Sequence, residues 1–196
     1  MKMNPKEILV PTISLFIICL VSTLLLALVN QITEPTINEG MAKAEAAARI
    51  EVLPEAEEFN EIDEDNDEII DYYEGLDASG EIIGYVFNTT GDVQGYAGAI
   101  SITIGISIDG KITGIVPGDL SNETPGLGQN AGKTSWLAQF VGESGQLKVV
   151  KADINAQKDT TDGKINAITS ATITSEALTS SVNVALDKFE EIGGNN

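Results

Sequence analysis

The chain has 196 residues, of which 42% are apolar and 21% are charged, so it has room for one domain and enough apolar side chains to bury a core. It carries 11 basic and 30 acidic residues, a formal net charge of −19, which makes nucleic acid and anionic lipid headgroups poor partners. Because Cys19 is the only cysteine and there is no histidine, intrachain disulfides, Cys/His zinc sites, iron–sulfur clusters, histidine-ligated haem and Ser-His-Asp catalysis are excluded, and any redox chemistry must use an organic cofactor.

An uncharged run of 22 residues, Ile8 to Val29, lies near the N-terminus. As a helix it would span about 33 Å, which matches a bilayer core, so residues 1–30 are predicted to be a short cytoplasmic N-terminus and a transmembrane anchor. A cleaved signal peptide is the alternative, but the run is too long and ends in a poor cleavage site.

The charges around this run predict which side of the membrane each part occupies. Lys2 and Lys6 precede the run, and the next base is Lys43. The positive-inside rule therefore predicts a single-pass protein of the cell membrane, with a cytoplasmic N-terminus and an extracytoplasmic remainder. That remainder has 9 basic and 29 acidic residues, a formal charge of −20.

Residues 31–60 are predicted to form a helical connector. An alanine-rich stretch, residues 38–52, places Met41, Ala44 and Ala48 on one face of a helix. Pro54 ends this helix, and a second short helical turn is expected over residues 54–59. Residues 61–196 then form one extracytoplasmic domain.

Twelve acids and no base lie between Glu55 and Asp77. Four carboxylates, together with Asp71, fall on ligand positions of an EF-hand calcium loop, but Glu68 stands where the sharp turn of that loop needs glycine. A solvated acidic loop is therefore the preferred interpretation, and no metal site is predicted. The carboxylates of the disfavoured calcium loop are Asp63, Asp65, Asp67 and Glu74.

Short β-rich stretches bounded by turn residues follow, which predicts an antiparallel sheet. Between two of them, Asp109-Gly110 predicts a type I′ hairpin. In the stretch from residue 100 to residue 108, isoleucines alternate with small or polar residues, so one face of this strand is expected to pack on the core. The predicted strands are residues 72–76, 82–89, 99–108, 111–116 and, after the loops described next, 147–150 with Ile154.

The loop at residues 121–128, SNETPGLG, contains Gly126 and Gly128, which would let the backbone approach a ligand closely. The same residues could equally form an ordinary turn. Residues 133–140 then predict a short amphipathic helix with Trp136 in the core.

The segment NAITSATITS, residues 166–175, leads into the last helix. From residue 175 onward, apolar residues recur at three- and four-residue spacings until Gly193 and Gly194. With Thr174 or Ser175 as N-cap, Thr172 would lie just before the helix start, where free N–H groups and the helix dipole favour a phosphate. The alternative is that these hydroxyl residues only form a turn and a cap. The apolar stripe comprises Leu178, Val182, Ala185, Leu186, Phe189 and Ile192.

The segment TSAT-x-TS, residues 169–175, resembles the S/T-G-A-T-x-S/T flavinylation motif of a family of FMN-binding proteins. That family comprises the G subunit of the Rnf complex and the C subunit of the sodium-pumping NADH:quinone reductase. The stretches VLPEA, GYAGAI and ETPGLG, which begin at Val52, Gly95 and Glu123, resemble that family in the same order. The chain departs from the family at Ser170, where glycine is usual, and at Asn166, where aspartate is usual.

The resemblance implies an α+β fold, with one N-terminal transmembrane helix followed by a single extracytoplasmic FMN-binding domain of antiparallel sheet and packed helices. It also implies that the FMN phosphate is esterified to Thr172 by a flavin transferase. The protein would then be an electron-transfer subunit of an ion-translocating oxidoreductase complex of the Rnf type, with the other subunits as partners and no enzyme activity of its own. The implied cofactor-binding residues are Glu123, Thr124, Gly126, Leu127, Gly128, Thr169, Ser170, Ala171 and Thr172.

Two other functions stay open at this point. One is a flavinylated extracytoplasmic domain that serves another electron route, such as reduction of a quinone or of an external acceptor. The other is a non-redox, membrane-anchored acidic binding module in which Thr172 belongs only to a helix cap.

Overall fold

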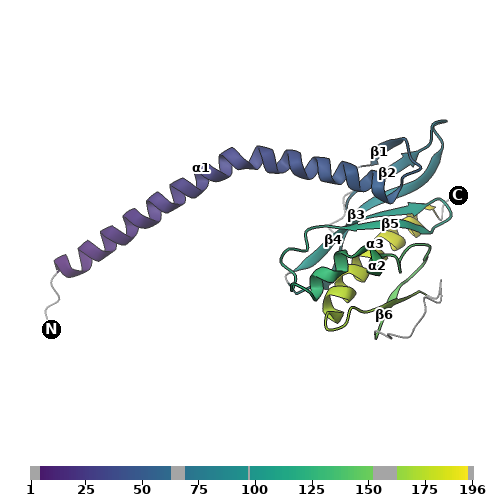
Figure 1. Cartoon of the computed structure of the whole chain (residues 1–196). Helices are drawn as coiled ribbons and strands as arrows, with labels where there is room; N and C mark the ends of the chain where they lie inside the picture. The colour runs from purple at the N-terminus through teal and green to yellow at the C-terminus, as the bar shows by residue number, and fades with distance from the viewer. Residues whose placement is uncertain (1–4, 63–68, 97, 152–162, 194–196) are drawn as a thin grey trace. The chain divides into compact units, whose positions relative to one another are not determined.

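The computed structural model describes residues 5–62, 69–96, 98–151 and 163–193. It divides into two compact units, Met1–Ala44 and Glu45–Asn196, and each is described by itself. Figure 1 shows the elements in chain order, from the purple N-terminal helix to the yellow C-terminal helix. The boundaries predicted at residues 30 and 60 stay predictions, although the second unit begins before residue 60.

Helix α1 runs from Pro5 to Val52, so the predicted anchor and the alanine-rich helix after it are parts of one helix. Among the described residues it is the one helix that is long and apolar enough to cross a membrane. The side chains of residues 8–45 are exposed, as a lipid-facing apolar segment requires. The predicted N-terminal apolar helix is therefore confirmed. The alanine-rich helix also ends before Pro54, as predicted.

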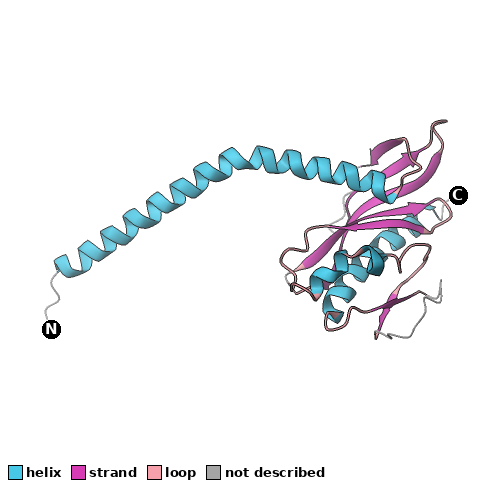
Figure 2. Ribbon diagram, viewed as in Figure 1, coloured by secondary structure: helices cyan, strands magenta, loops and turns pink. Residues whose placement is uncertain are grey.

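The second unit contains an antiparallel sheet with the strand order β1-β2-β3-β4-β5 (Figure 2). The antiparallel sheet predicted from the sequence is confirmed, and four of its strands lie where the sequence predicts them. The helical turn expected over residues 54–59 is wrong, because β1 begins at Glu58 and Phe59 pairs with Gly75 of β2. The strands are β1 (Glu58–Ile62), β2 (Ile69–Leu76), β3 (Ile82–Gln94), β4 (Ala99–Ser107) and β5 (Ile112–Pro117).

Helix α3, Thr172–Gly193, covers one face of the sheet at β3 and β4. Four of the six residues of the predicted apolar stripe are buried there, with Leu178 and Val182 fully inaccessible. The other two, Phe189 and Ile192, are partly buried against the same core cluster. Ser181 fixes the helix to the sheet, because its hydroxyl oxygen accepts a hydrogen bond from the Gly91 N–H at 2.8 Å and donates one to the Ile100 carbonyl oxygen at 2.6 Å. The last helix is thus held by both apolar packing and polar contacts.

The last turn of α1 covers the opposite face of the sheet. Val52 and Leu53 are buried there with Tyr73 and Val86. Gly105 of β4 pairs with Gly114 of β5, and a Cβ on either would collide with or crowd Val52. The face of β4 with small side chains, which the isoleucine alternation predicts, therefore packs against the end of α1.

The turn between β4 and β5 differs from the predicted type I′ hairpin. The Gly110 N–H donates to the Ser107 carbonyl oxygen at 2.9 Å, which makes Ile108 and Asp109 the central residues of the turn. Gly110 has φ +79°, whereas Asp109 has no positive φ. These features define a three-residue hairpin loop, in which a type I turn is followed by a residue in the left-handed conformation. Glycine occupies that position because it adopts a positive φ without strain.

Among the described residues, four short elements lie between β5 and α3. They are the 3₁₀-helix η1 (Gly128–Gly132), α2 (Thr134–Leu137), β6 (Lys148–Val150) and β7 (Lys164–Asn166). The helix predicted over residues 133–140 is shorter than expected, but Phe140 is fully buried and Trp136 packs on its ring at 5.2 Å between centroids. Strand β7, which pairs in parallel with β6, was not predicted because three residues carry too little pattern.

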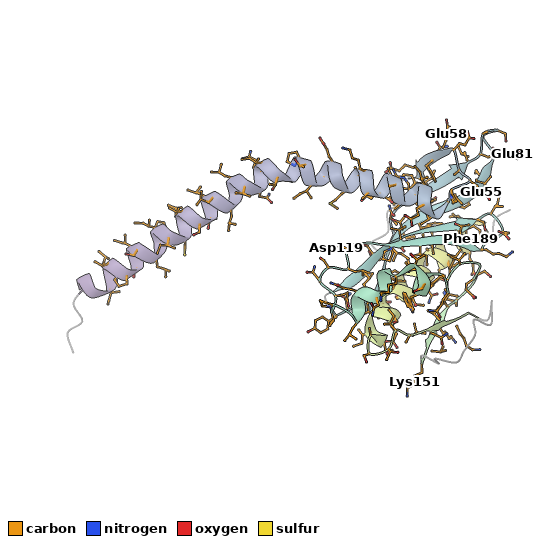
Figure 3. The ribbon with its side chains drawn as sticks, in the orientation of Figure 1. Glu55, Glu58, Glu81, Asp119, Lys151 and Phe189 are labelled. Carbon is orange, nitrogen blue, oxygen red and sulfur yellow. The ribbon has the colours of Figure 1, made fainter. Side chains whose placement is uncertain are left out.

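Acidic side chains surround the β1–β2 end of the sheet, where Glu55, Glu58 and Glu81 are exposed (Figure 3). The carboxylates Asp63, Asp65 and Asp67 of the disfavoured calcium loop lie outside the described residues, as does Ile154. Glu74 lies on β2. Among the residues that the structure describes, no three acidic, cysteine or histidine side chains converge on a common point.

Candidate functional site

The hinge before α3 is a tight turn. The Ala171 N–H donates to the Ile168 carbonyl oxygen at 2.9 Å, and Ser170 adopts φ +63°. Glycine takes this left-handed conformation freely, whereas a residue with a Cβ is strained in it. The strain accounts in physical terms for the glycine that is usual in the related flavinylation motif at the place of Ser170.

Helix α3 begins at Thr172, earlier than predicted. The first helical hydrogen bond runs from the Ser175 N–H to the Ala171 carbonyl oxygen at 3.1 Å, so Ala171 occupies the N-cap position. The prediction that Thr174 or Ser175 caps the helix is therefore wrong. Ser175 instead lies buried in the first turn, where its hydroxyl accepts from the Ile168 N–H and donates to the Ala171 carbonyl oxygen, both at 2.9 Å.

Thr172 is the first residue of α3, and its side chain is exposed. The first N–H groups of a helix have no acceptor within the helix, and Ala171 has no side-chain oxygen to receive them. These donors and the positive end of the helix dipole favour an anion beside the Thr172 hydroxyl. Thr172 therefore lies at the helix start, although the helix begins three or four residues earlier than an N-cap at Thr174 or Ser175 implies.

The loop at residues 119–130 is fixed by polar contacts of its own. Asp119 accepts hydrogen bonds from the N–H and the hydroxyl of Ser121 at 2.8 and 2.9 Å, and these bonds hold the pKa of its carboxyl below the usual value. Gly126 has φ +75°, and its carbonyl oxygen accepts from the Asn130 side-chain amide at 2.6 Å. The loop is therefore held in one shape at both ends.

The hinge and this loop meet in a cavity of about 320 Å³, at the lower end of the range for small-molecule sites. The structure thus brings together segments that the sequence separates by more than 40 residues. Of the nine predicted site residues, Thr124, Leu127, Gly128, Ser170, Ala171 and Thr172 line this cavity; Glu123, Gly126 and Thr169 do not. The other lining residues are Tyr96, Ile173 and Thr174.

Two exposed apolar side chains at the cavity were missed from the sequence. Tyr96 is 77% exposed and Ile173 is 59% exposed. Tyr96 belongs to the GYAGAI segment, in which the sequence analysis named no site residue. The available signal was an aromatic residue in a glycine-containing segment, where a turn can present it at the surface.

The lining has the chemistry that FMN requires. All the lining residues are described, and none of them is acidic or basic at neutral pH, although the domain as a whole is strongly acidic. Tyr96, Leu127 and Ile173 offer apolar surface for a planar ring system, while Thr172 and the start of α3 offer a hydroxyl and N–H donors for a phosphate. The residues present therefore fit FMN.

Trp136 lies outside the cavity lining and binds the chain just before the hinge. Its indole N–H donates to the Asn166 carbonyl oxygen at 2.8 Å, and the Asn166 N–H donates to the side-chain oxygen of Gln139 at 2.9 Å. These bonds fix the chain where it leaves β7. The prediction that Trp136 packs in the core is consistent with its contact with Phe140.

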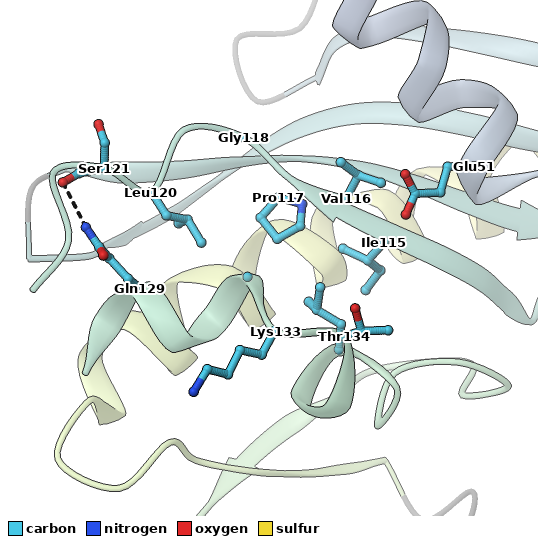
Figure 4. A pocket seen from close by; sticks show the side chains of 12 residues that line it. Glu51, Ile115, Val116, Pro117, Gly118, Leu120, Ser121, Gln129, Lys133 and Thr134 are labelled. Atoms are coloured by element: carbon cyan, nitrogen blue, oxygen red, sulfur yellow. Dashed lines mark hydrogen bonds between the residues drawn. The ribbon is translucent and has the colours of Figure 1, made fainter. Parts of the chain in front are cut away.

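A second and larger cavity, of about 620 Å³, is lined by residues of β5 and of η1, among others (Figure 4). Glu51, Pro117, Gln129 and Lys133 are among its lining residues, and Gln129 donates to the Ser121 carbonyl oxygen at 3.1 Å. Its lining contains none of the predicted site residues. We therefore place the candidate site at the smaller cavity, where the predicted segments converge.

Comparison with known proteins gives matches to both parts of the chain. A family model described as an FMN-binding domain matches residues 95–187, and one described as the RnfG N-terminal region matches residues 1–52. The chain is 37% identical to the G subunit of the Na(+)-translocating ferredoxin:NAD(+) oxidoreductase complex of Acetobacterium woodii, over 91% of this chain and 89% of the relative. It is 34% identical to the G subunit of the ion-translocating oxidoreductase complex of Methanosarcina acetivorans, over 94% of this chain and 95% of the relative.

A solved structure, the crystal structure of Shewanella oneidensis NqrC, is similar with a TM-score of 0.47 and 19% identity. The match covers 69% of this chain and 66% of that chain.

Proposed function

The chain belongs to the family of G subunits of ion-translocating oxidoreductase complexes, and from this premise we propose that it carries one FMN on Thr172 and transfers electrons within a membrane-bound complex of the Rnf type. When bound, FMN supplies a group that accepts and donates electrons, which the amino-acid side chains here do not supply. The protein is a subunit of a translocase and not an enzyme by itself. Ferredoxin, NAD⁺ and the ion path belong to other subunits.

One observation carries this proposal: the exposed Thr172 hydroxyl lies at the start of α3, on the wall of the cavity that the loop at residues 124–128 completes. The Thr172 oxygen would hold the phosphate through an ester bond, and the N–H groups of the first helical turn would attract its negative charge. Tyr96, Leu127 and Ile173 would contact the ring system.

The neutral lining supports this assignment in a domain with so many carboxylates. A phosphate brings negative charge, so acidic side chains in the wall would repel it. The carboxylate nearest the site in sequence, Glu123, lies behind the wall and is only 4% exposed. The anion would therefore meet helix N–H groups and hydroxyls.

An ester to Thr172 also suits the place that we propose for the domain, outside the cytoplasm. Lys2 and Lys6 before the apolar segment support this orientation. A covalent bond prevents loss of the cofactor where FMN is not replenished, and a flavin transferase would form it. The phosphate linkage leaves the ring system chemically unmodified.

The test compares Thr172→Ala with Thr134→Ala, since both threonines are exposed and each is the first residue of a helix, while Thr134 lies outside the hinge and outside the lining of the candidate site. The full chain is produced in its native host, and denatured protein is analysed by intact mass and in-gel flavin fluorescence. We expect the wild type and Thr134→Ala to carry the mass of FMN less one water, and Thr172→Ala to carry none. An unmodified wild type in a host with an active transferase, or a Thr172→Ala variant that keeps the flavin, would refute the proposal.

A further inference from the structure

The Glu123 carboxylate is buried beside the cavity without lining it. The Thr174 hydroxyl, which is only 3% exposed, donates to Glu123 Oε2 at 2.7 Å. Thr174 lies in the first turn of α3, two residues after Thr172, so this bond joins the ETPGLG loop to the helix start across 51 residues of sequence.

Glycines of two different segments pack against the same carboxylate. A Cβ placed on Gly128 would lie 2.5 Å from Glu123 Oε2, and a Cβ placed on Gly95 would lie 2.8 Å from Oε1. Gly95 opens the turn that presents Tyr96, because its N–H donates to the Gly98 carbonyl oxygen at 2.6 Å. The carboxylate therefore lies between all three segments that form the cavity wall.

We propose that Glu123 is a positioning residue that sets the distances among the Tyr96 turn, the ETPGLG loop and the start of α3. Burial of a carboxylate costs free energy that an apolar side chain of similar size would avoid. An apolar side chain, however, could not accept the Thr174 hydroxyl, which would then be buried without a partner. The role of Glu123 is thus to shape the wall and not to contact the flavin.

This inference rests on the proposed function only where it concerns FMN, since the wall can be tested without a flavin. In a Thr172→Ala background, backbone hydrogen exchange is compared for Glu123→Gln, Glu123→Ala and Thr174→Val. The matched control is Thr103→Val, because the Thr103 hydroxyl is also buried and donates to a side-chain oxygen, that of Asn88, at 2.7 Å.

We expect exchange in residues 124–130 and 168–175 to rise by about tenfold in Glu123→Ala and Thr174→Val, which corresponds to about 1.4 kcal/mol. Glu123→Gln keeps an oxygen of the same shape for Thr174, so its exchange in these segments should stay within about twofold of the parent. Thr103→Val should change exchange in β3 and β4 but not in these segments. Unchanged exchange in Glu123→Ala, or a Glu123→Gln variant as open as Glu123→Ala, would overturn the inference.

A second readout uses protein that carries flavin on Thr172. Quenching of flavin fluorescence by iodide should rise severalfold in Glu123→Ala and should match the wild type in Glu123→Gln and Thr103→Val, because only a displaced wall admits the ion. Equal quenching in all four proteins would overturn the inference. If the wild type carries no flavin, the proposed function fails, while the exchange measurements still decide the role of Glu123.

Discussion

Gly128→Ala is expected to destabilise the domain, whereas Gly132→Ala is not. Both glycines lie in η1 and neither has a positive φ, so the backbone accepts alanine at both positions. At Gly128 the added Cβ would lie 2.5 Å from Glu123 Oε2 and 2.9 Å from Thr174 Oγ1. At Gly132 the nearest atom is Leu120 Cδ1, at 3.3 Å. The two variants therefore differ mainly in what the methyl group meets.

The Glu123 carboxylate cannot turn away from this methyl group at little cost, since it is buried and holds the Thr174 hydroxyl. Overpacking of this kind costs about 1–3 kcal/mol. The lower entropy of the unfolded chain, worth about 0.4–1 kcal/mol in favour of alanine, is common to both variants and cancels in the comparison. In a domain of this size the difference corresponds to about 2–12 °C in Tm.

The measurement is thermal unfolding of the full chain in detergent, followed by circular dichroism, for the wild type and both variants. We expect Gly128→Ala to unfold at the lower temperature and Gly132→Ala to unfold at or slightly above the temperature of the wild type. Equal Tm values for the two variants, or a larger loss in Gly132→Ala, would refute the packing that we describe around Glu123.

Ser170→Gly should raise the free energy of unfolding by about 0.5–1 kcal/mol, because glycine relieves the left-handed strain at φ +63°. Ser180→Gly, in the middle of α3, should lower the free energy of unfolding by about 1 kcal/mol, because glycine is a poorer helix former and the hydrogen bond from the Ser180 hydroxyl to Asp92 is lost. Urea titration measures both, and a loss in Ser170→Gly would contradict the assigned turn. Burial raises the pKa of Tyr73 and of Tyr85 above the ordinary value of 10.0, so the unfolded chain ionises first and stability should fall as the pH rises through 10. The variant with both Tyr73→Phe and Tyr85→Phe should lose less stability than the wild type over the same rise in pH. An identical dependence of stability on pH in the two proteins would show that these tyrosines do not cause the loss.

Local pattern predicts much of this fold. The alternating isoleucines of β4 and the apolar stripe of α3 both bury the side that their period indicates. Strand β1 was missed because its residues pair with β2 rather than following their own helical tendency, and β7 is too short to show a period. Elements that depend on a distant partner are therefore the ones that local pattern misses.

The candidate site could be predicted only in part, because some of its features also depend on segments that are distant in the sequence. The motif residues Thr124, Gly128 and Thr172 do meet at one cavity. The position of Glu123 behind the wall depends on three segments that approach one another only in the folded domain, so its place could not be read from its motif. The start of α3 was predicted too late in the chain because serine is a common N-cap residue. In the structure the Ser175 hydroxyl instead lies in the first turn of the helix and bonds to the Ile168 N–H and the Ala171 carbonyl oxygen.

The contacts of Ser181 also determine when this domain can finish folding during synthesis. They join α3 to residues 81 and 90 positions earlier in the chain, so β3 and β4 leave the ribosome long before the helix that covers them. Until α3 arrives, the apolar face of these strands has no cover, and closing such long loops is slow. A chain held at the membrane by its first helix must therefore keep a partly formed sheet from aggregating until its last helix is made.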